Sequence, residues 1–184
     1  MTALAASLTS RLRRLLKDRG AVAAVEFAIT LPVMLGLYLG SVEATQGISV
    51  KRKVTLTARA VADLSSQFTS ISNADMTNVL NAASAIIAPY APANLQATVS
   101  EVAIDSQGNA TVVWSDSLQG TPLAVGQSVT VPSALAVPNT YLILGQASYS
   151  YNPPYAYVIT STLTLTDQFF MRPRQSASIA RTPS

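Results

Sequence analysis

The chain has 184 residues, of which 49% are hydrophobic and 11% are charged, and this composition excludes a disordered chain and differs from that of an ordinary cytosolic enzyme. It contains no Cys and no His, which excludes disulfides, Cys/His metal sites, thiol nucleophiles and the commonest general base. The net charge of +3 is unevenly distributed, because residues 1–20 carry +4 and the remainder carries −1. No basic residue lies between positions 60 and 171, so we expect no binding of nucleic acid.

The first predicted element is a membrane helix over residues 21–40. Residues 21–39 form a run of 19 residues in which Glu26 is the only charge. At about 1.5 Å per residue, this run nearly spans the ~30 Å hydrocarbon core of a bilayer. Five basic residues precede the run and none follows it for eleven residues, which disfavours a buried core helix. The positive-inside rule then orients the N-terminus to the cytoplasm and everything after about Gly40 to the outer side of the membrane.

A cleaved secretory signal peptide is an alternative interpretation, because it also has basic residues followed by an apolar run. Two features favour membrane anchoring instead. The run is longer than the apolar region of a signal peptide, and the segment SVEATQG that follows offers no A-x-A-like cleavage site.

Glu26 is unfavourable in a bilayer, where an ionised side chain at mid-depth costs at least ~2.5–3.5 kcal/mol. The run contains no Lys or Arg that could pair with it. A cut near Gly20 would remove the basic leader and create a positive α-amino group close by. Glu26 of a neighbouring subunit could then pair with that group, and the pair would help to specify the axial register of the subunits. Alternatively, Glu26 lies near the cytoplasmic headgroups and reaches out to them.

Gly20, the string AVAAVEFAITLP and the string GLYLGSVEATQG together resemble the N-terminus of the TadE-like and TadG-like minor pilins (pseudopilins) of the tight-adherence (Tad) type IV pilus system. The resemblance implies that residues 1–20 are a cytoplasmic prepilin leader, which a prepilin peptidase removes after Gly20 so that Ala21 becomes the N-terminus. In that family the Glu is usually fifth after the cut, whereas Glu26 is sixth. A cut after Ala21 is therefore the alternative.

The same resemblance assigns further residues of the N-terminal segment. It implies that Glu26 is the family's near-terminal Glu, Phe27 its following aromatic residue and Pro32 its helix proline. Glu43 matches the G-x-x-E that closes the family's hydrophobic segment. Near the other end of the chain, YSYNPPY followed by FFMRPRQS resembles the family's Tyr-rich strand and closing Arg-Pro-Arg.

The resemblance also implies a function in pilus assembly and surface adhesion, with biofilm formation as a downstream effect. The implied partners are a prepilin peptidase, other pilin and minor pilin subunits, an inner-membrane assembly platform and the lipid bilayer. The alternative is an uncleaved membrane anchor that carries a periplasmic binding module unrelated to a filament. Replacement of Glu26 would impair assembly in the first case and would do no harm in the second.

Small residues recur at four-residue intervals in the membrane segment, at Gly36, Gly40 and Ala44. Such a spacing permits the close approach of a second membrane helix, although it also arises by chance. Pro32 removes one backbone hydrogen bond, so we expect it to kink or loosen the helix.

Residues 41–88 are predicted to be helical and extracytoplasmic. The first helix is expected to continue as an amphipathic helix whose apolar stripe comprises Val54, Ala58, Val61, Leu64 and Phe68. Its charged residues are expected to be solvated, namely Lys51, Arg52, Lys53, Arg59 and Asp63. A second helix is predicted over residues 73–88, capped by Ser72 or Asn73 and ended by Pro89. Its expected core face comprises Met76, Val79, Leu80, Ala83, Ile86 and Ile87.

Residues 89–184 are predicted to form an antiparallel sheet, because the hydrophobic period changes to two. The expected strands are 95–104, 110–115, 141–151 and 155–166, with a DSQGN hairpin between the first pair and an NPP turn between the last. Residues 118–139 are expected to be a long loop with one short strand at 128–131. A long apolar helix with an amphipathic extension, followed by a small antiparallel sheet, makes the fold class α+β.

No catalytic or cofactor site is predicted. The sequence has no G-x-S-x-G elbow, no S-x-x-K pair, no glycine-rich phosphate loop and no D-x-D-x-D loop. A hydrolase that uses two carboxylates distant in sequence is formally open, with nothing that favours it. We expect the Tyr cluster and Trp114 to serve packing rather than ligand binding, the cluster being Tyr149, Tyr151, Tyr155 and Tyr157.

Overall fold

The computed structural model describes residues 19–153 and 160–182. The chain divides into two compact units. The first comprises residues 1–45 and 154–160, and its described part is mainly helical. The second, which we call the body, comprises residues 46–153 and 161–184.

Helix α2 (Arg19–Ser66) is 48 residues long and contains Pro32 in its interior. The predicted membrane helix and its amphipathic continuation are therefore one helix, and the helix continues past the proline. Within the body, α2 buries the predicted stripe, since Val54, Ala58 and Val61 are at most 1% exposed. Leu64 and Phe68 are partly buried and pack against the same core.

Helix α3 (Asn73–Ile86) begins at a capping box. The Ser72 hydroxyl accepts a hydrogen bond from the Asp75 backbone N–H, and the Asp75 carboxylate accepts one from the Ser72 backbone N–H. The Asp75 carboxylate also accepts a hydrogen bond from the Ser72 hydroxyl, and this bond and the one from the Ser72 backbone N–H lower the pKa of Asp75. The helix ends two residues before the predicted boundary, and the predicted core face is confirmed except for Ile86, which is partly exposed.

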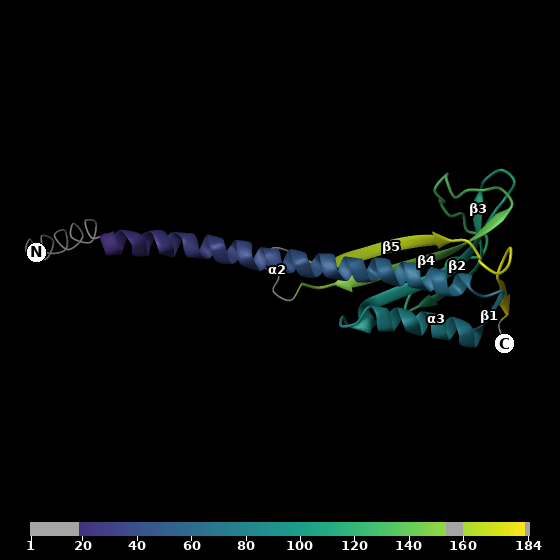
Figure 1. Cartoon of the computed structure of the whole chain (residues 1–184), viewed down its shortest axis with the longest axis horizontal. Helices are drawn as coiled ribbons and strands as arrows, with labels where there is room; N and C mark the ends of the chain where they lie inside the picture. Colours follow the sequence, from purple (N-terminus) through teal and green to yellow (C-terminus); the bar gives the residue numbers. More distant parts are fainter. Residues whose placement is uncertain (1–18, 154–159, 183–184) are drawn as a thin grey trace, which may run out of the picture. The chain divides into compact units, whose positions relative to one another are not determined.

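Four antiparallel strands form the main sheet in the order β3-β2-β4-β5 (Figure 1). Their bounds are Leu95–Ile104 for β2, Ala110–Leu118 for β3, Thr140–Tyr151 for β4 and Leu163–Met171 for β5. The predicted hairpin between β2 and β3 is confirmed, with the Asp105 N–H donating to the Asn109 carbonyl at 2.9 Å. Gly108 in this turn has φ +87°, a conformation that favours glycine. The predicted α+β class is confirmed.

The bounds of two strands differ by more than one residue from those predicted. The last strand spans Leu163–Met171, so the described residues 160–162 of the predicted strand 155–166 are not part of it, and the strand extends five residues further. Residues 154–159, which include the last residue of the predicted NPP turn and two of the tyrosines, lie outside the described residues. The alternation of inward and outward side chains continues past Thr166 with Asp167 on the side that faces α2. There the carboxylate pairs with Lys51, so a charged residue is accommodated within the strand. Strand β3 runs three residues beyond the predicted Ser115.

Side chains from the two helices and from one face of the sheet form the larger core cluster. On β4, Ile143, Ala147 and Tyr149 belong to this cluster, whereas Leu142 and Leu144 point to a second cluster beneath the loop of residues 118–139. The predicted packing of Trp114, Tyr149 and Tyr151 is confirmed, as each is at most 7% exposed.

A β-bulge lets strand β3 serve both clusters. Glu101 pairs with Trp114 while Val102 pairs with Val112, so Val113 is the extra residue on β3. Without the bulge, Val112 and Trp114 would share a face, because side chains alternate along a strand. With it, Trp114 enters the helix-side core and Val112 lies opposite Val102 of the second cluster.

The loop of residues 118–139 forms a single bridge between Ser128 and Thr111 where a short strand at 128–131 was predicted. It still follows the edge of β3, because the Val112 N–H donates to the Gln127 carbonyl and the Val129 N–H donates to the Ala110 carbonyl, each at 2.9 Å. A 3-10 helix, η1 (Pro92–Asn94), precedes β2.

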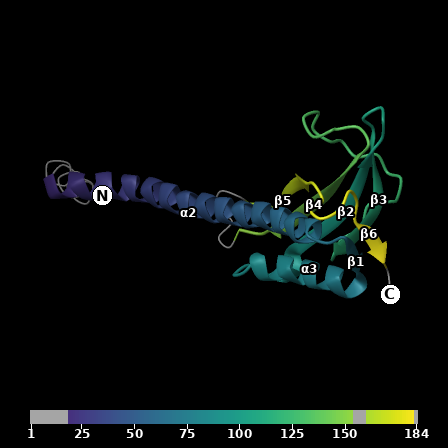
Figure 2. The same ribbon diagram turned by 45° about the vertical axis from the view of Figure 1, so that its right-hand side comes forward.

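Two three-residue strands pair in parallel and were not predicted, β1 (Ser70–Ser72) with β6 (Ala180–Thr182). Figure 2 shows them beside the start of α3. The pairing fixes the C-terminal segment to the turn between α2 and α3. Three residues are too few to show a hydrophobic period, which explains why the sequence does not indicate them.

Helix α2 lies directly against strand β4 at Gly145. A Cβ atom at this position would lie 2.3 Å from the Ala58 carbonyl oxygen and 2.9 Å from the Ala62 Cβ. Backbone and a short rigid side chain cannot give way by that amount, so the position requires glycine for steric reasons.

We predict that Gly145→Ala destabilises the protein by about 1–3 kcal/mol through overpacking. Gly47→Ala is the matched control, because its nearest contact would be the Tyr151 Cε1 atom at 3.8 Å, an ordinary van der Waals distance. That control should stabilise the helix by about 0.5–1 kcal/mol. Urea unfolding of the full chain in detergent, followed by the fluorescence of its single tryptophan, measures both; equal or greater stability of Gly145→Ala would contradict the prediction.

Candidate functional site

The apolar part of α2 is exposed along residues 22–38, and every residue of that range is classed as exposed. Exposed fractions reach 65% for Phe27 and 71% for Leu37. By length and composition, the helix over Gly20–Ser66 is long and apolar enough to cross a membrane, and no part of its most apolar stretch is buried by the rest of the chain. This combination indicates a single-pass membrane anchor.

The predicted cleavage position lies in the first described turn of α2, which begins at Arg19. Gly20 is exposed and Ala21 is partly exposed. Residues 1–18 of the predicted leader lie outside the described residues. Cleavage after Gly20 or Ala21 therefore stays a prediction.

Glu26 and Phe27 both lie on the exposed part of the helix. The Thr30 hydroxyl donates a hydrogen bond to the Glu26 backbone carbonyl, so this polar group of Thr30 is satisfied within the helix. Among the described residues, no basic side chain forms a salt bridge with the Glu26 carboxylate. A partner for this carboxylate is therefore to be sought outside the described part of the chain.

The predicted packing residues Gly36, Gly40 and Ala44 lie on one stretch of helix and share a face through their four-residue spacing. A Cβ atom at Gly36 would meet nothing within 4 Å. Gly40 is partly exposed and Ala44 is exposed. The approach of a second helix at this face, and any loosening at Pro32, stay predictions. Glu43, in contrast with Glu26, is fully buried.

Within the body, α2 is joined to strand β5 by a polar cluster at Asp167. The Lys51 ammonium lies 3.1 Å from the Asp167 carboxylate, and the Thr55 hydroxyl donates to the same carboxylate. Lys51 also donates to the Thr166 backbone carbonyl. The sequence predicted Lys51 to be solvated, and its side chain is 44% exposed, although it reaches over to the edge of the sheet and bonds there.

The electrostatics of Asp167 follow from this arrangement. Burial acts to raise its pKa, but hydrogen bonds from Thr55, Lys51 and the Gln168 backbone N–H outweigh burial and lower it. Asp167 is therefore ionised at neutral pH and accepts hydrogen bonds from both elements.

A second set of contacts lies further along α2. Arg174 forms an ion pair with Asp63, and its backbone N–H donates to the Ser66 carbonyl at 2.9 Å. The guanidinium of Arg59 lies 5.5 Å from the ring centroid of Phe169, a cation–π distance. The Arg-Pro-Arg segment near the end of the chain thus closes onto the last turns of the helix.

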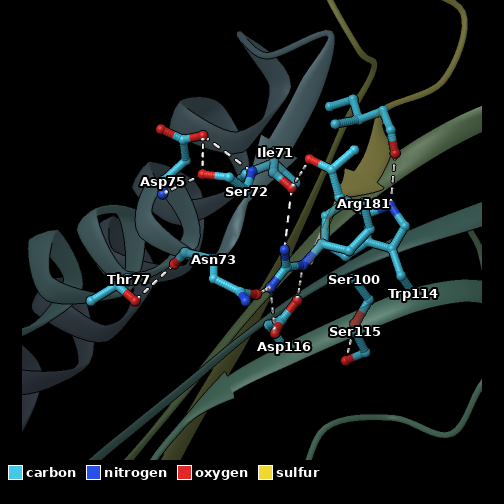
Figure 3. A network of polar contacts seen from close by, with 12 residues as sticks. Ile71, Ser72, Asn73, Asp75, Thr77, Ser100, Trp114, Ser115, Asp116 and Arg181 are labelled. Atoms are coloured by element: carbon cyan, nitrogen blue, oxygen red, sulfur yellow. Dashed lines mark hydrogen bonds and ion pairs between the residues drawn. The ribbon is translucent and has the colours of Figure 1, made fainter. Parts of the chain in front are cut away.

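Arg181 of β6 connects three elements (Figure 3). Its guanidinium donates to both carboxylate oxygens of Asp116 on β3, at 2.8 and 3.3 Å. It also donates to the Ile71 carbonyl at 3.2 Å and to the Asn73 side chain at 2.6 Å. Only Arg presents enough donors in one plane for all four bonds, so this residue holds the C-terminal strand to α3 and to the sheet.

Glu101 is buried in the sheet, where it is 2% exposed. It accepts a hydrogen bond from the Ile179 backbone N–H at 2.6 Å, and the Trp114 indole N–H donates to the Ile179 carbonyl at 2.8 Å. Burial raises the pKa of Glu101, while the hydrogen bond from the Ile179 backbone N–H acts to lower it. The carboxylate therefore satisfies a buried backbone group of the C-terminal segment.

The described residues offer no evident catalytic arrangement. No group of three or more Asp or Glu side chains among them could hold a metal ion. A shallow groove of about 400 Å³ on the sheet is lined mainly by uncharged amide and hydroxyl side chains, from Gln96, Thr98, Gln146, Ser148, Thr166 and Gln168. Such groups bind and orient polar ligands but supply neither a nucleophile with a base nor an acid–base pair. The one acidic lining residue of the groove, Asp167, is already paired with Lys51.

Sequence reasoning missed four polar contacts of the body that hold the C-terminal half together: Lys51–Asp167, Asp63–Arg174, Arg181–Asp116 and Glu101 with Ile179. The partners lie between 65 and 116 residues apart in the chain. The one feature of the sequence that indicated such contacts was the near balance of basic and acidic residues after residue 20. This balance is compatible with ion pairs but does not identify which residues pair.

The model of the TadE-like protein family matches residues 21–63. The match begins at Ala21 and includes Glu26, Phe27, Pro32 and Glu43. It confirms the resemblance predicted from the N-terminal motifs and relates the chain to the Tad pilus, although it covers under a quarter of the 184 residues. Searches of the curated proteins and of the solved structures return no match to this chain.

We predict that Asp167→Asn lowers the free energy of unfolding at pH 7 by up to about 1 kcal/mol, since the ion pair is partly exposed. The lowered pKa means that the folded state binds fewer protons than the unfolded state. The stabilisation is therefore present above the unfolded pKa of about 3.9 and is lost as the pH falls through the folded pKa.

Unfolding of both proteins in detergent at pH 7 and near pH 3 measures this difference. Thr164→Ala, an exposed residue of the same strand, is the control and should show no pH-dependent difference. A difference between Asp167→Asn and the parent chain that stayed constant over this pH range would contradict the assigned role.

Proposed function

We propose that this chain is a pilin-like subunit, a minor pilin or pseudopilin, of a tight-adherence pilus. The observation that carries the proposal is the TadE-like family match, which begins directly after Gly20. The exposed apolar side chains of residues 22–38 support it. A helix that is apolar on all sides and has no buried face in its own chain requires lipid or other apolar helices around it.

In this proposal the chain is made as a prepilin with its basic N-terminus in the cytoplasm. A prepilin peptidase removes residues 1–20, and the body lies on the periplasmic or extracellular side. The unequal charge on the two sides of the apolar run supports this orientation. The maturation would also supply Glu26 with a partner, the α-amino group of a neighbouring subunit.

The mature subunit would act with other pilin subunits and an inner-membrane assembly platform, and it would contribute to adhesion through the assembled pilus. The absence of a catalytic arrangement among the described residues is compatible with a structural role. An uncleaved anchor bearing an independent binding module has no observation that favours it, because such a protein needs neither Glu26 nor the family segment.

Maturation is tested by intact mass and N-terminal sequencing of the membrane-extracted protein, expressed with the cognate prepilin peptidase or with an inactive form of it. We expect a new terminus at Ala21, or at Val22 if the cut follows Ala21, only with the active peptidase. An intact N-terminus in both samples would contradict the maturation step and would favour the uncleaved anchor.

The role of Glu26 is tested by Glu26→Ala and by the uncharged near-isostere Glu26→Gln. Both should lower the yield of sheared pili about tenfold or more, because a subunit without the carboxylate leaves a neighbouring amino group unpaired in lipid. Membrane insertion should be unchanged or improved. Thr30→Ala, one turn along the same exposed helix, is the control and should assemble normally. Normal pilus yield from both Glu26 variants would overturn the pairing.

A further inference from the structure

We propose that a groove between α2 and the end of β5 is a docking surface for an acidic segment of a partner protein that carries an apolar side chain. The groove has a volume of about 410 Å³. Its lining, which defines the α2–β5 groove, comprises Leu56, Arg59, Ala60, Asp63, Met171 and Arg174. All of these residues belong to the body.

The floor of the α2–β5 groove offers apolar contacts. Leu56 is 53% exposed, although it lies in the part of α2 that carries the core stripe, and Phe169 beside the groove is 36% exposed. Met171 is partly buried. Protein interfaces are enriched in Arg, Met and aromatic residues relative to other surfaces, and this groove and its margin combine all three types.

The charge of the groove is positive and incompletely balanced. Asp63 pairs with Arg174, but Arg59 forms no salt bridge with any described carboxylate. Arg52 is exposed and lies seven residues before Arg59, so the two share a helix face. Among the described residues Arg52 likewise forms no salt bridge. A complementary partner therefore presents carboxylates around its apolar side chain.

Two other anionic partners fit less well. Leu56 lies 16 residues beyond Gly40, so it is roughly 24 Å along the helix from the predicted end of the membrane segment. That distance exceeds the headgroup layer of about 5–8 Å together with a Debye length of about 8 Å. A nucleic acid needs several phosphate contacts in a row, and the body has no basic residue between 60 and 171.

This inference does not depend on cleavage of the leader or on entry into a filament, because the groove lies within the body. It would survive an intact N-terminus in the maturation experiment. Conversely, loss of the docking surface would leave maturation and the role of Glu26 untouched.

The test uses the full chain in nonionic detergent and a fluorescent amphipathic peptide of alternating Glu and Leu, followed by anisotropy. We expect this peptide to bind at least about tenfold more tightly than peptides with Gln or Lys in place of Glu, and the affinity to fall as salt shortens the Debye length. Arg52→Glu and Arg59→Glu should each weaken binding about tenfold, and Leu56→Ser should weaken it by a similar factor.

Lys53→Glu is the matched control, since it makes the same charge change on α2 but lies about 120° around the helix from Arg59. It should alter the affinity less than about twofold. Failure of the Glu peptide to bind, equal binding of the Gln or Lys peptide, or unchanged binding by both arginine variants would overturn the proposal. Displacement of the peptide by a short-chain phosphatidylglycerol at monomeric concentrations would overturn it in favour of a lipid headgroup.

Discussion

The body depends on the close approach of helix α2 to strand β4 at Gly145, where there is no room for a Cβ atom. This approach brings Ala58 and Ala62 onto the sheet and leaves the larger side chains of the helix to fill the spaces on either side of it. Small residues at the point of contact allow tight packing, and tight packing excludes water from the apolar cluster. The same approach brings Lys51, Thr55 and Arg59 within reach of β5, so the polar contacts at that edge follow from the steric constraint.

Each edge of the sheet is protected by a different device. At β5, Lys51 donates to the Thr166 carbonyl, which occupies a backbone acceptor at the edge with a charged side chain. At β3, the loop of residues 118–139 supplies backbone hydrogen bonds. The C-terminal segment is also held to β3, by the hydrogen bond of the Trp114 indole to the Ile179 carbonyl and by the ion pair of Arg181 with Asp116. An unprotected edge would offer a template for strand pairing with other chains, a particular hazard for a protein concentrated in a membrane.

The pattern of apolar and polar residues was sufficient to predict the helices and strands that are long enough to repeat their hydrophobic period. The 48-residue helix, the second helix and strand β2 each repeat their hydrophobic period several times. The parallel pair β1–β6, the bulge at Val113 and the buried Glu101 have no such signal, because they depend on contacts between distant segments. Among the candidate site residues, sequence predicted the exposed apolar helix, but the positive α2–β5 groove required the structure, since Met171 and Arg174 lie over 100 residues from Arg59.

The acidic residues show why Glu26 stands apart from the rest of the chain. Three acidic residues after the leader form salt bridges, namely Asp63, Asp116 and Asp167. Asp75 and Asp105 accept backbone hydrogen bonds in a helix cap and in a turn. Glu43 and Glu101 are buried and interact with neighbouring groups. Glu26 alone among the described carboxylates forms no such contact, and it lies on the most apolar surface. A charge that the described fold does not compensate is costly within a segment suited to lipid. Under the proposed function, the α-amino group of a neighbouring subunit would compensate it, and this is the property of Glu26 that the assembly experiment tests.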